Sequence, residues 1–234
     1  MNAGSNWDMV ERLEVLTIDG PSGVGKSTIS RRVAARLGYT YLDTGAMYRA
    51  VALKCQLAGI DTSDKAALNE VLSSLEMQIF PASLEGDDVQ VILDGVNVSE
   101  HIRTEEISML ASAVSAQKPV RDTLTRIQQE MGAQGKVVAE GRDTGTVVFP
   151  GAAWKIYLDA TPKERARRRI KQLRQKGLVV NEQEILAQII KRDRDDSERA
   201  LAPLKAAPDA VYIDATILGP DEVVKRILEV VRRK

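Results

Sequence analysis

The sequence is poor in the residues that carry several common kinds of chemistry. Its 234 residues include one cysteine and one histidine. A disulfide within the chain is therefore excluded, and so is a metal site built from several histidines. Cys55 lies in the apolar run YRAVALKCQLAG, where a small buried side chain is expected rather than a reactive thiol. His101 lies in the polar stretch VSEHIRTEE, where we expect a solvated loop.

An excess of one charge and long apolar runs are missing too. The 33 basic and 33 acidic side chains cancel, which argues against a general binder of nucleic acid or membrane surfaces. Aromatic residues make up 4% of the chain, too few for an array that stacks RNA bases. No run approaches the ~18 apolar residues of a membrane span. The N-terminus MNAGSNWDMVERLEV has no apolar core of signal-peptide length. We therefore expect a cytoplasmic protein without nucleic-acid or membrane partners.

What is present is an alternation of short apolar runs with longer amphipathic runs. This pattern is typical of βαβ units around a parallel sheet, so the expected fold class is α/β. Gly38 should end the first helix, and Pro220 should lie in the first turn of the last helix. The expected strands are LEVLTID, YTYLD, KVVAEG, WKIYLDA and DAVYIDA, and the expected helices include GKSTISRRVAARLG, AMYRAVALKCQLAG and PDEVVKRILEVVRRK.

Residues 60–103 interrupt this alternation. In VQVILDGVNV, apolar residues alternate around Asp94-Gly95, a dipeptide that favours a tight hairpin turn. This stretch predicts a small antiparallel insert outside the parallel sheet. A further helix is expected to begin at Thr104, with Pro119 beyond its end.

A strongly basic helix is predicted in TPKERARRRIKQLRQKG. Thr161 and Glu164 have the spacing of a capping box, and a second helix follows with Asn181 as its cap. Between Lys163 and Lys176 lie eight basic residues and one acidic residue. This helix is either a lid that closes over a triphosphate or a solvated helix that touches RNA. We favour the lid, because unopposed positive charges repel until an anion arrives. Residues that share a face are Arg165, Arg168 and Arg169, or Arg167 and Lys171.

A phosphate-binding loop is predicted between the first strand and the first helix, where the sequence matches G-x-x-x-x-G-K-[ST]. Its backbone N–H groups converge on phosphate oxygens, Lys26 adds a cation for the β and γ phosphates, and Ser27 is a candidate ligand of Mg²⁺. The Asn-Lys-x-Asp element of GTPases is absent from the sequence. The expected ATP-binding residues are Gly20, Pro21, Ser22, Gly23, Val24, Gly25, Lys26, Ser27 and Thr28.

Arginines are abundant although general bases are scarce. A phosphate acceptor is already an anion, so its transfer reaction needs charge neutralisation and alignment rather than a base. The guanidinium group pairs with two phosphate oxygens at once. A sugar or alcohol acceptor fits less well, because a hydroxyl often needs a nearby carboxylate base. The candidates near predicted element ends are Arg49, Arg103, Arg121, Arg142, Arg192, Arg194 and Arg199.

Three further motifs, LDTGAMYRAV, GRDTGTVVFP and KRDRDDSERALAPL, follow GPSGVGKS in this order. With them the sequence resembles the bacterial cytidylate kinases of the P-loop nucleoside monophosphate kinase family, from about Leu13 to the last helix. The resemblance implies a P-loop-type parallel sheet flanked by helices, a monophosphate-binding lobe with a small antiparallel β insert, and a helical lid. The implied boundaries are an extension at 1–12, core at 13–45, the lobe at 46–118 with its insert at about 60–103, core at 119–160, the lid at 161–180 and core at 181–234.

The resemblance also implies a reaction, namely ATP- and Mg²⁺-dependent transfer of a phosphoryl group to CMP and dCMP. The products are CDP or dCDP and ADP, in pyrimidine nucleotide metabolism, and the enzyme is expected to be a monomer. Ser27 is the implied metal ligand. The implied catalytic residues are Lys26, Arg142, Arg168 and Arg169, and the implied CMP-binding residues are Thr44, Tyr48, Arg49, Ser112, Arg121, Arg142, Asp143, Arg192, Asp196 and Arg199.

Alternatives remain for the base-reading residue and for the reaction. The resemblance implies that Asp143 accepts a hydrogen bond from the cytosine amino group, where it would repel the keto oxygen of uracil, and that Ser112 and Arg121 complete the contact with the base. The alternative is that Asp143 forms a purely structural ion pair with Arg142 or another arginine. For the segment RDRDDSER, the alternative to nucleotide binding is an exposed helix face with i,i+4 ion pairs. Competing functions are a kinase for UMP or AMP and an ATP-binding module that binds RNA.

Overall fold

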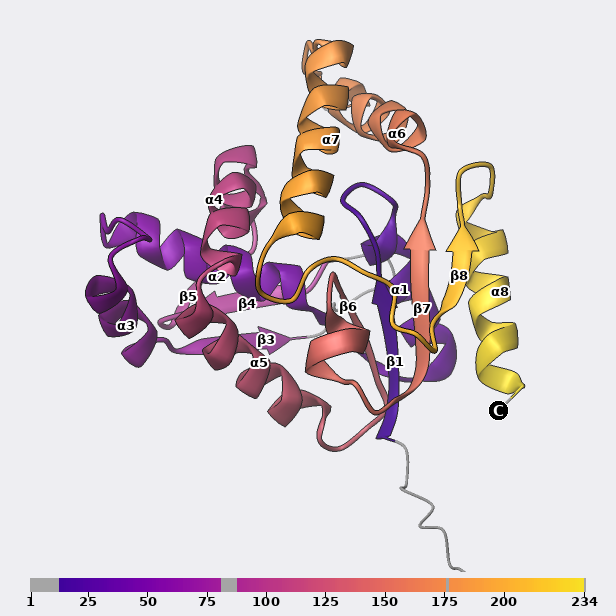
Figure 1. The fold of residues 1–234 in the computed structure, drawn as a ribbon, viewed down its shortest axis with the longest axis horizontal. Coiled ribbons are helices and arrows are strands. Elements are labelled where there is room, and N and C mark those ends of the chain that lie inside the picture. The colour runs from indigo at the N-terminus through magenta and orange to yellow at the C-terminus, as the bar shows by residue number, and fades with distance from the viewer. Residues whose placement is uncertain (1–12, 81–87, 176, 234) are drawn as a thin grey trace, which may run out of the picture.

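The computed structural model describes residues 13–80, 88–175 and 177–233. The expected extension at 1–12 lies outside these residues, as do 81–87 of the insert and the last residue of the chain. At the centre is a five-stranded parallel sheet in the order β2-β6-β1-β7-β8 (Figure 1). All five expected strands are confirmed. Their bounds are Leu13–Asp19 for β1, Thr40–Asp43 for β2, Val137–Gly141 for β6, Ala152–Asp159 for β7 and Val211–Asp214 for β8.

Helices α1 (Lys26–Leu37) and α8 (Pro220–Arg232) pack against each other beside this sheet. Gly38 ends α1 with φ at 67°, a left-handed conformation that glycine adopts without strain, as predicted. A short π-helical turn, η2 (Thr144–Val148), follows β6 and contacts β1, β6 and β7. It places the residues of the GRDTG motif at the carboxyl end of the sheet.

A second lobe lies beside the sheet and contains the expected insert (Figure 1). Its antiparallel sheet has the order β3-β4-β5. Asp94 and Gly95 both have positive φ, 49° and 80°, as a type I′ hairpin turn requires. The helix α3 inside the insert was not predicted. The lobe comprises α2 (Thr44–Leu57), α3 (Lys65–Ser73), β3 (Met77–Phe80), β4 (Gln90–Leu93), β5 (Val96–Asn97), η1 (His101–Arg103), α4 (Glu105–Ser115) and α5 (Lys118–Gly132).

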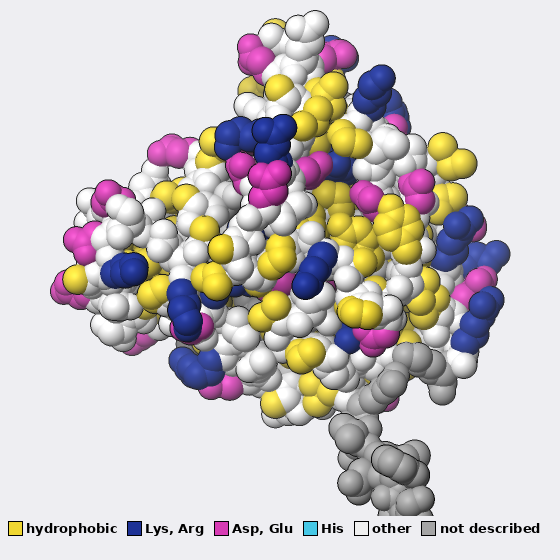
Figure 2. Space-filling model, in the orientation of Figure 1, with side chains coloured by type: hydrophobic (Ala, Val, Ile, Leu, Met, Phe, Trp, Pro, Cys, Tyr) yellow, Lys and Arg dark blue, Asp and Glu magenta, His cyan; other side chains and the backbone are white. Residues whose placement is uncertain are grey.

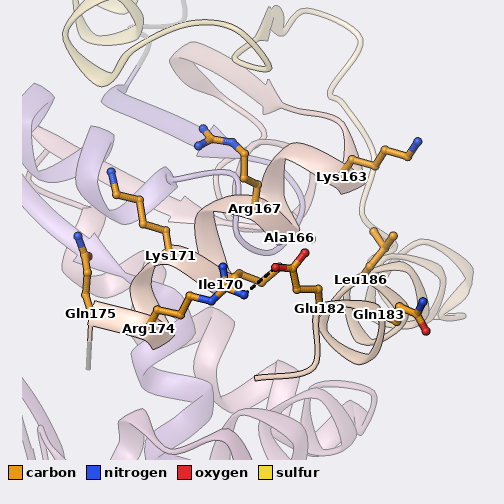
Figure 3. A pocket seen from close by; sticks show the side chains of 10 residues that line it. All are labelled: Lys163, Ala166, Arg167, Ile170, Lys171, Arg174, Gln175, Glu182, Gln183 and Leu186. Carbon is orange, nitrogen blue, oxygen red and sulfur yellow. Dashed lines mark hydrogen bonds and ion pairs between the residues drawn. The ribbon is translucent and has the colours of Figure 1, made fainter. Parts of the chain in front are cut away.

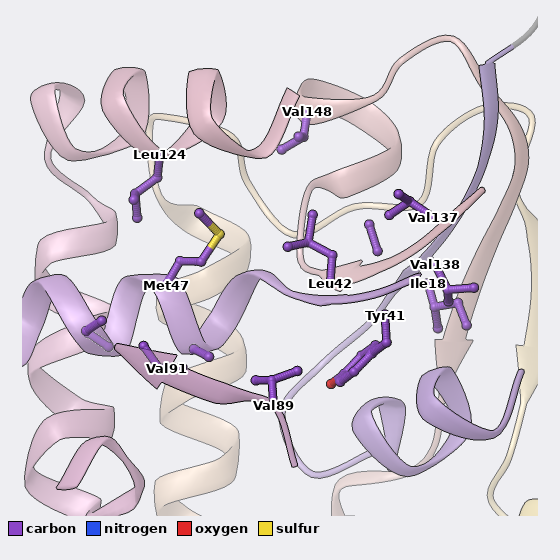
Figure 4. Packing of buried hydrophobic residues seen from close by; sticks show 14 of the residues in the cluster. Ile18, Tyr41, Leu42, Met47, Val89, Val91, Leu124, Val137, Val138 and Val148 are labelled. Atoms are coloured by element: carbon purple, nitrogen blue, oxygen red, sulfur yellow. The ribbon is translucent and has the colours of Figure 1, made fainter. Parts of the chain in front are cut away.

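One hydrophobic core joins the sheet to this lobe. Met47 of α2 and Leu124 of α5 are completely buried, and Figure 4 shows them directed toward each other. Leu42 and Val138 continue the same core in the sheet. Cys55 is buried in this core, as predicted. His101 is exposed, but it lies in η1 rather than in a loop.

The basic helix α6 (Pro162–Gln175) and the following α7 (Glu182–Glu198) form a hairpin that projects from the carboxyl end of the sheet (Figure 1). A small core of its own, including Ala166, Ile170 and Ile189, holds the two helices together. The predicted capping box is half formed. Thr161 Oγ1 accepts from the Glu164 N–H at 3.4 Å, but the Glu164 carboxylate binds arginines of α6 instead. Among the described residues, no helix combines the length and the apolarity needed to cross a bilayer.

Candidate active site

The predicted phosphate-binding loop connects β1 to α1. Lys26 is buried, and its Nζ donates to the carbonyl oxygens of Gly20 and Pro21, each at 2.8 Å. Burial, reinforced by the positive charge of Arg142, lowers the pKa of Lys26 to about 7. Gly20 has no room for a side chain, because a Cβ there would lie 2.0 Å from the carbonyl oxygen of Leu158. The loop therefore has its backbone close to β7 and its lysine folded inward.

Three carboxylates lie at the carboxyl ends of neighbouring strands, Asp19 on β1, Asp43 on β2 and Glu140 on β6. In open α/β sheets ligands bind at this edge, particularly where the strand order reverses. Asp19 and Glu140 were not among the predicted site residues. The available signal was an acidic residue at the end of a buried apolar strand, in LTID and VVAE.

Glu140 is tied to the phosphate-binding loop through Ser27. Ser27 Oγ and the Tyr41 hydroxyl each donate to Glu140 Oε1 at 2.7 Å. The other oxygen, Oε2, is buried and has no hydrogen-bond partner among the described residues. Burial, followed by the charge of Asp43, raises the pKa of Glu140 above its ordinary value. A cation beside Oε2 would pair with this oxygen and lower the pKa of Glu140 again.

Asp19 holds the turn that follows β6. Its carboxylate accepts from the Thr144 N–H at 2.9 Å, from Thr144 Oγ1 at 2.7 Å and from the Gly145 N–H at 2.7 Å. Burial nevertheless raises the pKa of Asp19. Thr44 Oγ1 donates to the carbonyl oxygen of Glu140 at 2.6 Å, which anchors the start of α2 to the same strand end. These bonds fix the backbone from which Arg142 and Asp143 extend.

Asp143 is the centre of a buried cluster of arginines. Arg121 of α5 forms an ion pair with one carboxylate oxygen, and Arg199, which follows α7, approaches the other at 3.4 Å. The arginine partners are therefore Arg121 and Arg199 rather than the neighbouring Arg142. Arg121 also lies 5.6 Å from the centre of the Tyr48 ring. Burial raises the pKa of Tyr48 to about 12, and its buried hydroxyl has no hydrogen-bond partner among the described residues.

The structure adds Ser115 to this cluster. Its carbonyl oxygen accepts from Arg121 at 3.0 Å, and its hydroxyl accepts from Arg199 at 3.4 Å. The predicted Ser112 lies one helical turn earlier and contributes its carbonyl oxygen to the Ser115 hydroxyl at 2.8 Å. Spacing alone did not distinguish these two serines of α4, because both lie on the same side of the helix.

A second ion pair joins Arg142 to Asp196 of α7, with Nε at 2.8 Å from Oδ2. Burial alone would raise the pKa of Asp196, but the charge of Arg142 and its hydrogen bond lower it overall. The interpretation of this segment as an exposed face of i,i+4 pairs is wrong for Asp196, which is 5% exposed. The exposed i,i+4 pair of α7 is Lys191 with Asp195.

Two arginines near this pair have unsatisfied groups. The Nε atoms of Arg49 and Arg192 are buried without a hydrogen-bond partner in the described part of the chain. Arg49 also donates to Asp43 at 3.1 Å. Arg103 pairs with Asp88 of the insert instead, and Arg194 is exposed on α7, so these two candidates do not join the cluster.

The three arginines of the predicted face, Arg165, Arg168 and Arg169, each contact another element, although the Arg169 side chain is 41% exposed. Arg165 donates to the Ser22 carbonyl at 2.9 Å and pairs with Asp193 of α7. Arg168 donates to the Val24 carbonyl at 3.0 Å. The expectation of unopposed charge is wrong, because α6 meets carboxylates from three elements. These are Glu164 in α6 itself, Asp193 and Glu182 in α7, and Glu105 in α4.

Comparison with known proteins finds similar sequences over nearly the whole chain. The family model described as cytidylate kinase matches residues 16–233. The cytidylate kinase of Citrifermentans bemidjiense is 47% identical over 220 residues, which cover 94% of this chain and 93% of that protein. The cytidylate kinase of Vibrio vulnificus is 45% identical over 97% of this chain and 99% of its own.

A solved structure shares the fold at much lower sequence identity. The uncharacterized protein from Eubacterium ventriosum is 9% identical, with a TM-score of 0.51 over 96% of this chain and 100% of its own. At this identity the likeness concerns the fold alone.

Proposed function

The chain belongs to the cytidylate kinase family, and from that membership we propose that it transfers the γ-phosphoryl group of ATP to CMP and dCMP. The products are ADP and the cytidine diphosphates. One observation supports this function above the others, namely that Lys26 and the ion pair of Arg142 with Asp196 meet at the carboxyl end of the sheet. A phosphate donor and a phosphate acceptor both require cations there.

The acceptor phosphate is bound by Arg49, Arg142 and Arg192. The unsatisfied Nε atoms of Arg49 and Arg192 are donors that a phosphate oxygen would complete. Arg142 binds Asp196 through its Nε, so further N–H groups of the guanidinium can donate to a second acceptor. Thr44 stands at the start of α2, where its bond to the Glu140 carbonyl oxygen fixes the acceptor side to the sheet.

The cytosine base is bound by Asp143, Arg121 and Ser112. Asp143 accepts from the exocyclic amino group, and a keto oxygen at that position would be repelled. Tyr48 supplies the neighbouring ring surface, and the cation of Arg121 lies over that ring. Arg121 keeps the carboxylate in place through their buried ion pair. Because both partners are held, the pocket is preorganised for an amino group.

The sugar lies beside Asp196 and Arg199. Asp196 is fixed by Arg142, and Arg199 is fixed by its bond to the Ala202 carbonyl at 2.7 Å. A carboxylate accepts from a 3′-hydroxyl in either nucleotide, which is consistent with both CMP and dCMP. The proposed lid keeps the boundaries 161–180, and the proposed lobe, expected at 46–118, also takes in α5 up to Gly132, which packs on α2, α3 and α4.

The donor triphosphate is bound by the loop from Gly20 to Thr28. Lys26 leaves the Gly20 and Pro21 carbonyls and donates to the β and γ phosphates, so phosphate binding replaces two internal hydrogen bonds. Arg168 and Arg169 neutralise the charge that spreads over the transferred group. No side chain has to remove a proton from the acceptor, because its phosphate oxygen is already ionised.

The residues present fit Mg²⁺. Mg²⁺ is usually held by one or two carboxylates together with substrate phosphates and waters, rather than by an all-protein cage. Ser27 and the orphaned Oε2 of Glu140 meet that description. His, Cys, Asp and Glu side chains nowhere gather in threes as a metal site within the described residues, which suits such a shared site. When bound, the ion would supply positive charge that offsets the negative charge of the phosphates.

The test is a substrate panel with ADP release as the readout. CMP, dCMP, UMP, AMP and GMP are compared for wild type, Asp143→Ala and the exposed control Asp195→Ala. We expect turnover of both cytidylates, with about tenfold to hundredfold selectivity over UMP that is lost in Asp143→Ala alone. Equal activity on UMP in wild type would reject the assignment of the base, and no turnover of any monophosphate would reject the kinase.

The oligomeric state and the compartment are proposed on family resemblance. The enzyme acts as a monomer in the cytoplasm. Its partners are its small-molecule substrates, ATP and the cytidylates, and not nucleic acid. Sedimentation equilibrium of the full chain tests the monomer, and a mass of two chains would contradict it.

A further inference from the structure

Helix α6 has two basic faces, of which phosphoryl transfer uses one. Arg165 and Arg168 contact the phosphate-binding loop, through the carbonyls of Ser22 and Val24. The second face lies on the other side of the helix, because its members follow at intervals of four, four and three residues from Lys163. This second face consists of Lys163, Arg167, Lys171 and Arg174.

The second face borders a cavity of about 690 Å³ between α6 and the start of α7. Its floor is apolar and belongs to the small core of the helix hairpin, and its rim is charged. Figure 3 shows the lining side chains, which project from both helices. The floor residues are Ala166, Ile170 and Leu186, and the rim includes Lys163, Arg167, Lys171, Arg174, Glu182 and Gln183.

The positive charge of the rim is only half neutralised. Arg167 forms two hydrogen bonds of 2.7 Å with Glu164, and Arg174 pairs with Glu182 at 2.7 Å. Lys163 and Lys171 form no hydrogen bond or ion pair with any described residue. Both are exposed. Two lysines that lie eight residues apart, about two turns of α6, are therefore available on the same rim to an anion in the cavity.

We propose that this cavity is a second binding site, separate from the nucleotide site, for a compact organic polyphosphate. The phosphates bind Lys163 and Lys171, with Arg167 between them. The apolar part of the ligand covers Ile170 and Leu186. Pairing an apolar floor with a few placed cations is the usual construction of a small-ligand pocket, and the volume lies within the range of about 300–1,000 Å³ for such pockets.

The concave shape favours a small polyphosphate over RNA. An RNA-binding face requires an extended basic stripe and usually aromatic side chains for stacking. This rim has no aromatic residue, and the chain has no net positive charge. Basic and acidic side chains are interspersed over the face of the molecule shown in Figure 2 rather than segregated.

Occupation of the cavity would restrain the hairpin that carries active-site residues. A ligand bridging α6 and α7 fixes the helix of Arg165 and Arg168 relative to the helix of Asp193. Since Arg192 and Asp196 also belong to α7, the proposed site is placed to act as a regulatory site. This consequence rests on the proposed function, whereas binding itself does not.

Calorimetric titration of inorganic tripolyphosphate into the full chain tests the binding. The phosphate-binding loop provides one site, and the cavity provides a second. In Lys163→Gln/Lys171→Gln, we expect the second site to weaken about five- to thirtyfold while the first is unchanged. The control Lys65→Gln/Lys225→Gln removes the same charge from exposed lysines of α3 and α8 and should leave both sites intact. Wild-type binding at a single site that Lys26→Ala abolishes would overturn the proposal.

A second titration tests the apolar floor. GTP is titrated after a dinucleoside pentaphosphate carrying adenosine and cytidine has filled both nucleotide subsites, an arrangement that rests on the proposed function. We expect GTP to bind more tightly than tripolyphosphate, in a manner that depends on the two lysines. If single-stranded RNA of mixed sequence binds through these lysines and tripolyphosphate does not, this is an RNA-binding surface and the proposal is wrong.

Discussion

Arg121 of α5 and Asp143, two residues after the end of β6, form an ion pair in which both side chains are less than a tenth exposed, at 6% and 8%. Burying two charges is costly unless each satisfies the other, so their pairing keeps this part of the fold intact. The partners are separated by 22 residues and come from the second lobe and the central sheet. The pair therefore connects the lobe that carries the proposed acceptor site to the strand end that bears Arg142.

The first prediction concerns the stability that depends on this pair. Arg121→Met or Asp143→Asn leaves one charged partner buried, and each should lower the free energy of unfolding by about 3–5 kcal/mol. The double variant should cost clearly less than the sum. Urea unfolding measures all four proteins. Lys118→Met and Asp122→Asn are the control, because that pair lies on the same helix but is 71% and 61% exposed. Costs equal to the control would contradict the prediction.

The elements with strong local signals could be predicted from the sequence. The five strands were short apolar runs, and the turn at Asp94-Gly95 was specified by residues that accept positive φ. Helix α3 was missed because KAALNEVLS is short, and its cap, the Asp64 carboxylate accepting from two N–H groups, resembles an ordinary polar turn. A nine-residue helix is stabilised mainly by packing, in this case by the burial of Leu68 and Val71.

The site was predictable only as far as motifs extend. The motifs identified Lys26 and Asp143. The hydrogen bond from Ser27 to Glu140 depends on β6 lying beside β1, and the sequence does not give the strand order. The same limit explains the error about α6. Apart from Glu164, its counter-charges come from helices α4 and α7, so the local count of charges could not show that Arg169 meets Glu105 across 64 residues.

The second prediction concerns Glu140. Its raised pKa means that the folded chain binds the proton more tightly than the unfolded chain, so the stability contributed at this site falls as pH rises above about 4.5, the ordinary value. Glu140→Gln removes this penalty and should make the protein more stable at neutral pH. The same change should raise the Mg²⁺ concentration for half-maximal activity by about ten- to a hundredfold.

Thermal unfolding and Mg²⁺ titration of the rate measure the two effects separately. Glu130→Gln serves as the matched variant, since Glu130 is 61% exposed and pairs with Arg126 on the surface of α5. It should change neither quantity. A Glu140→Gln protein that loses stability and activity together would identify Glu140 as a structural residue without a role toward the ion.

The third prediction concerns the ion pair between the α6–α7 hairpin and the second lobe, in which Arg169 of α6 lies 2.9 Å from Glu105 of α4. Glu105 competes with phosphate for Arg169 if that arginine neutralises the transferred group. Both side chains are substantially exposed, 41% and 56%, so the competition is weak and amounts to about 1 kcal/mol at most. Glu105→Gln should therefore lower the KM for ATP by up to about fivefold.

The neighbouring Glu106 supplies the control for this experiment. It accepts from the Gln56 side chain and not from Arg169, so Glu106→Gln removes the same charge from the first turn of α4 without freeing the arginine. Steady-state rates at low salt and at about 0.5 M salt measure the effect, and the gain in Glu105→Gln should shrink at high salt because exposed ion pairs are screened. An equal gain in Glu106→Gln would mean that the overall charge of α4, rather than the contact with Arg169, controls ATP binding.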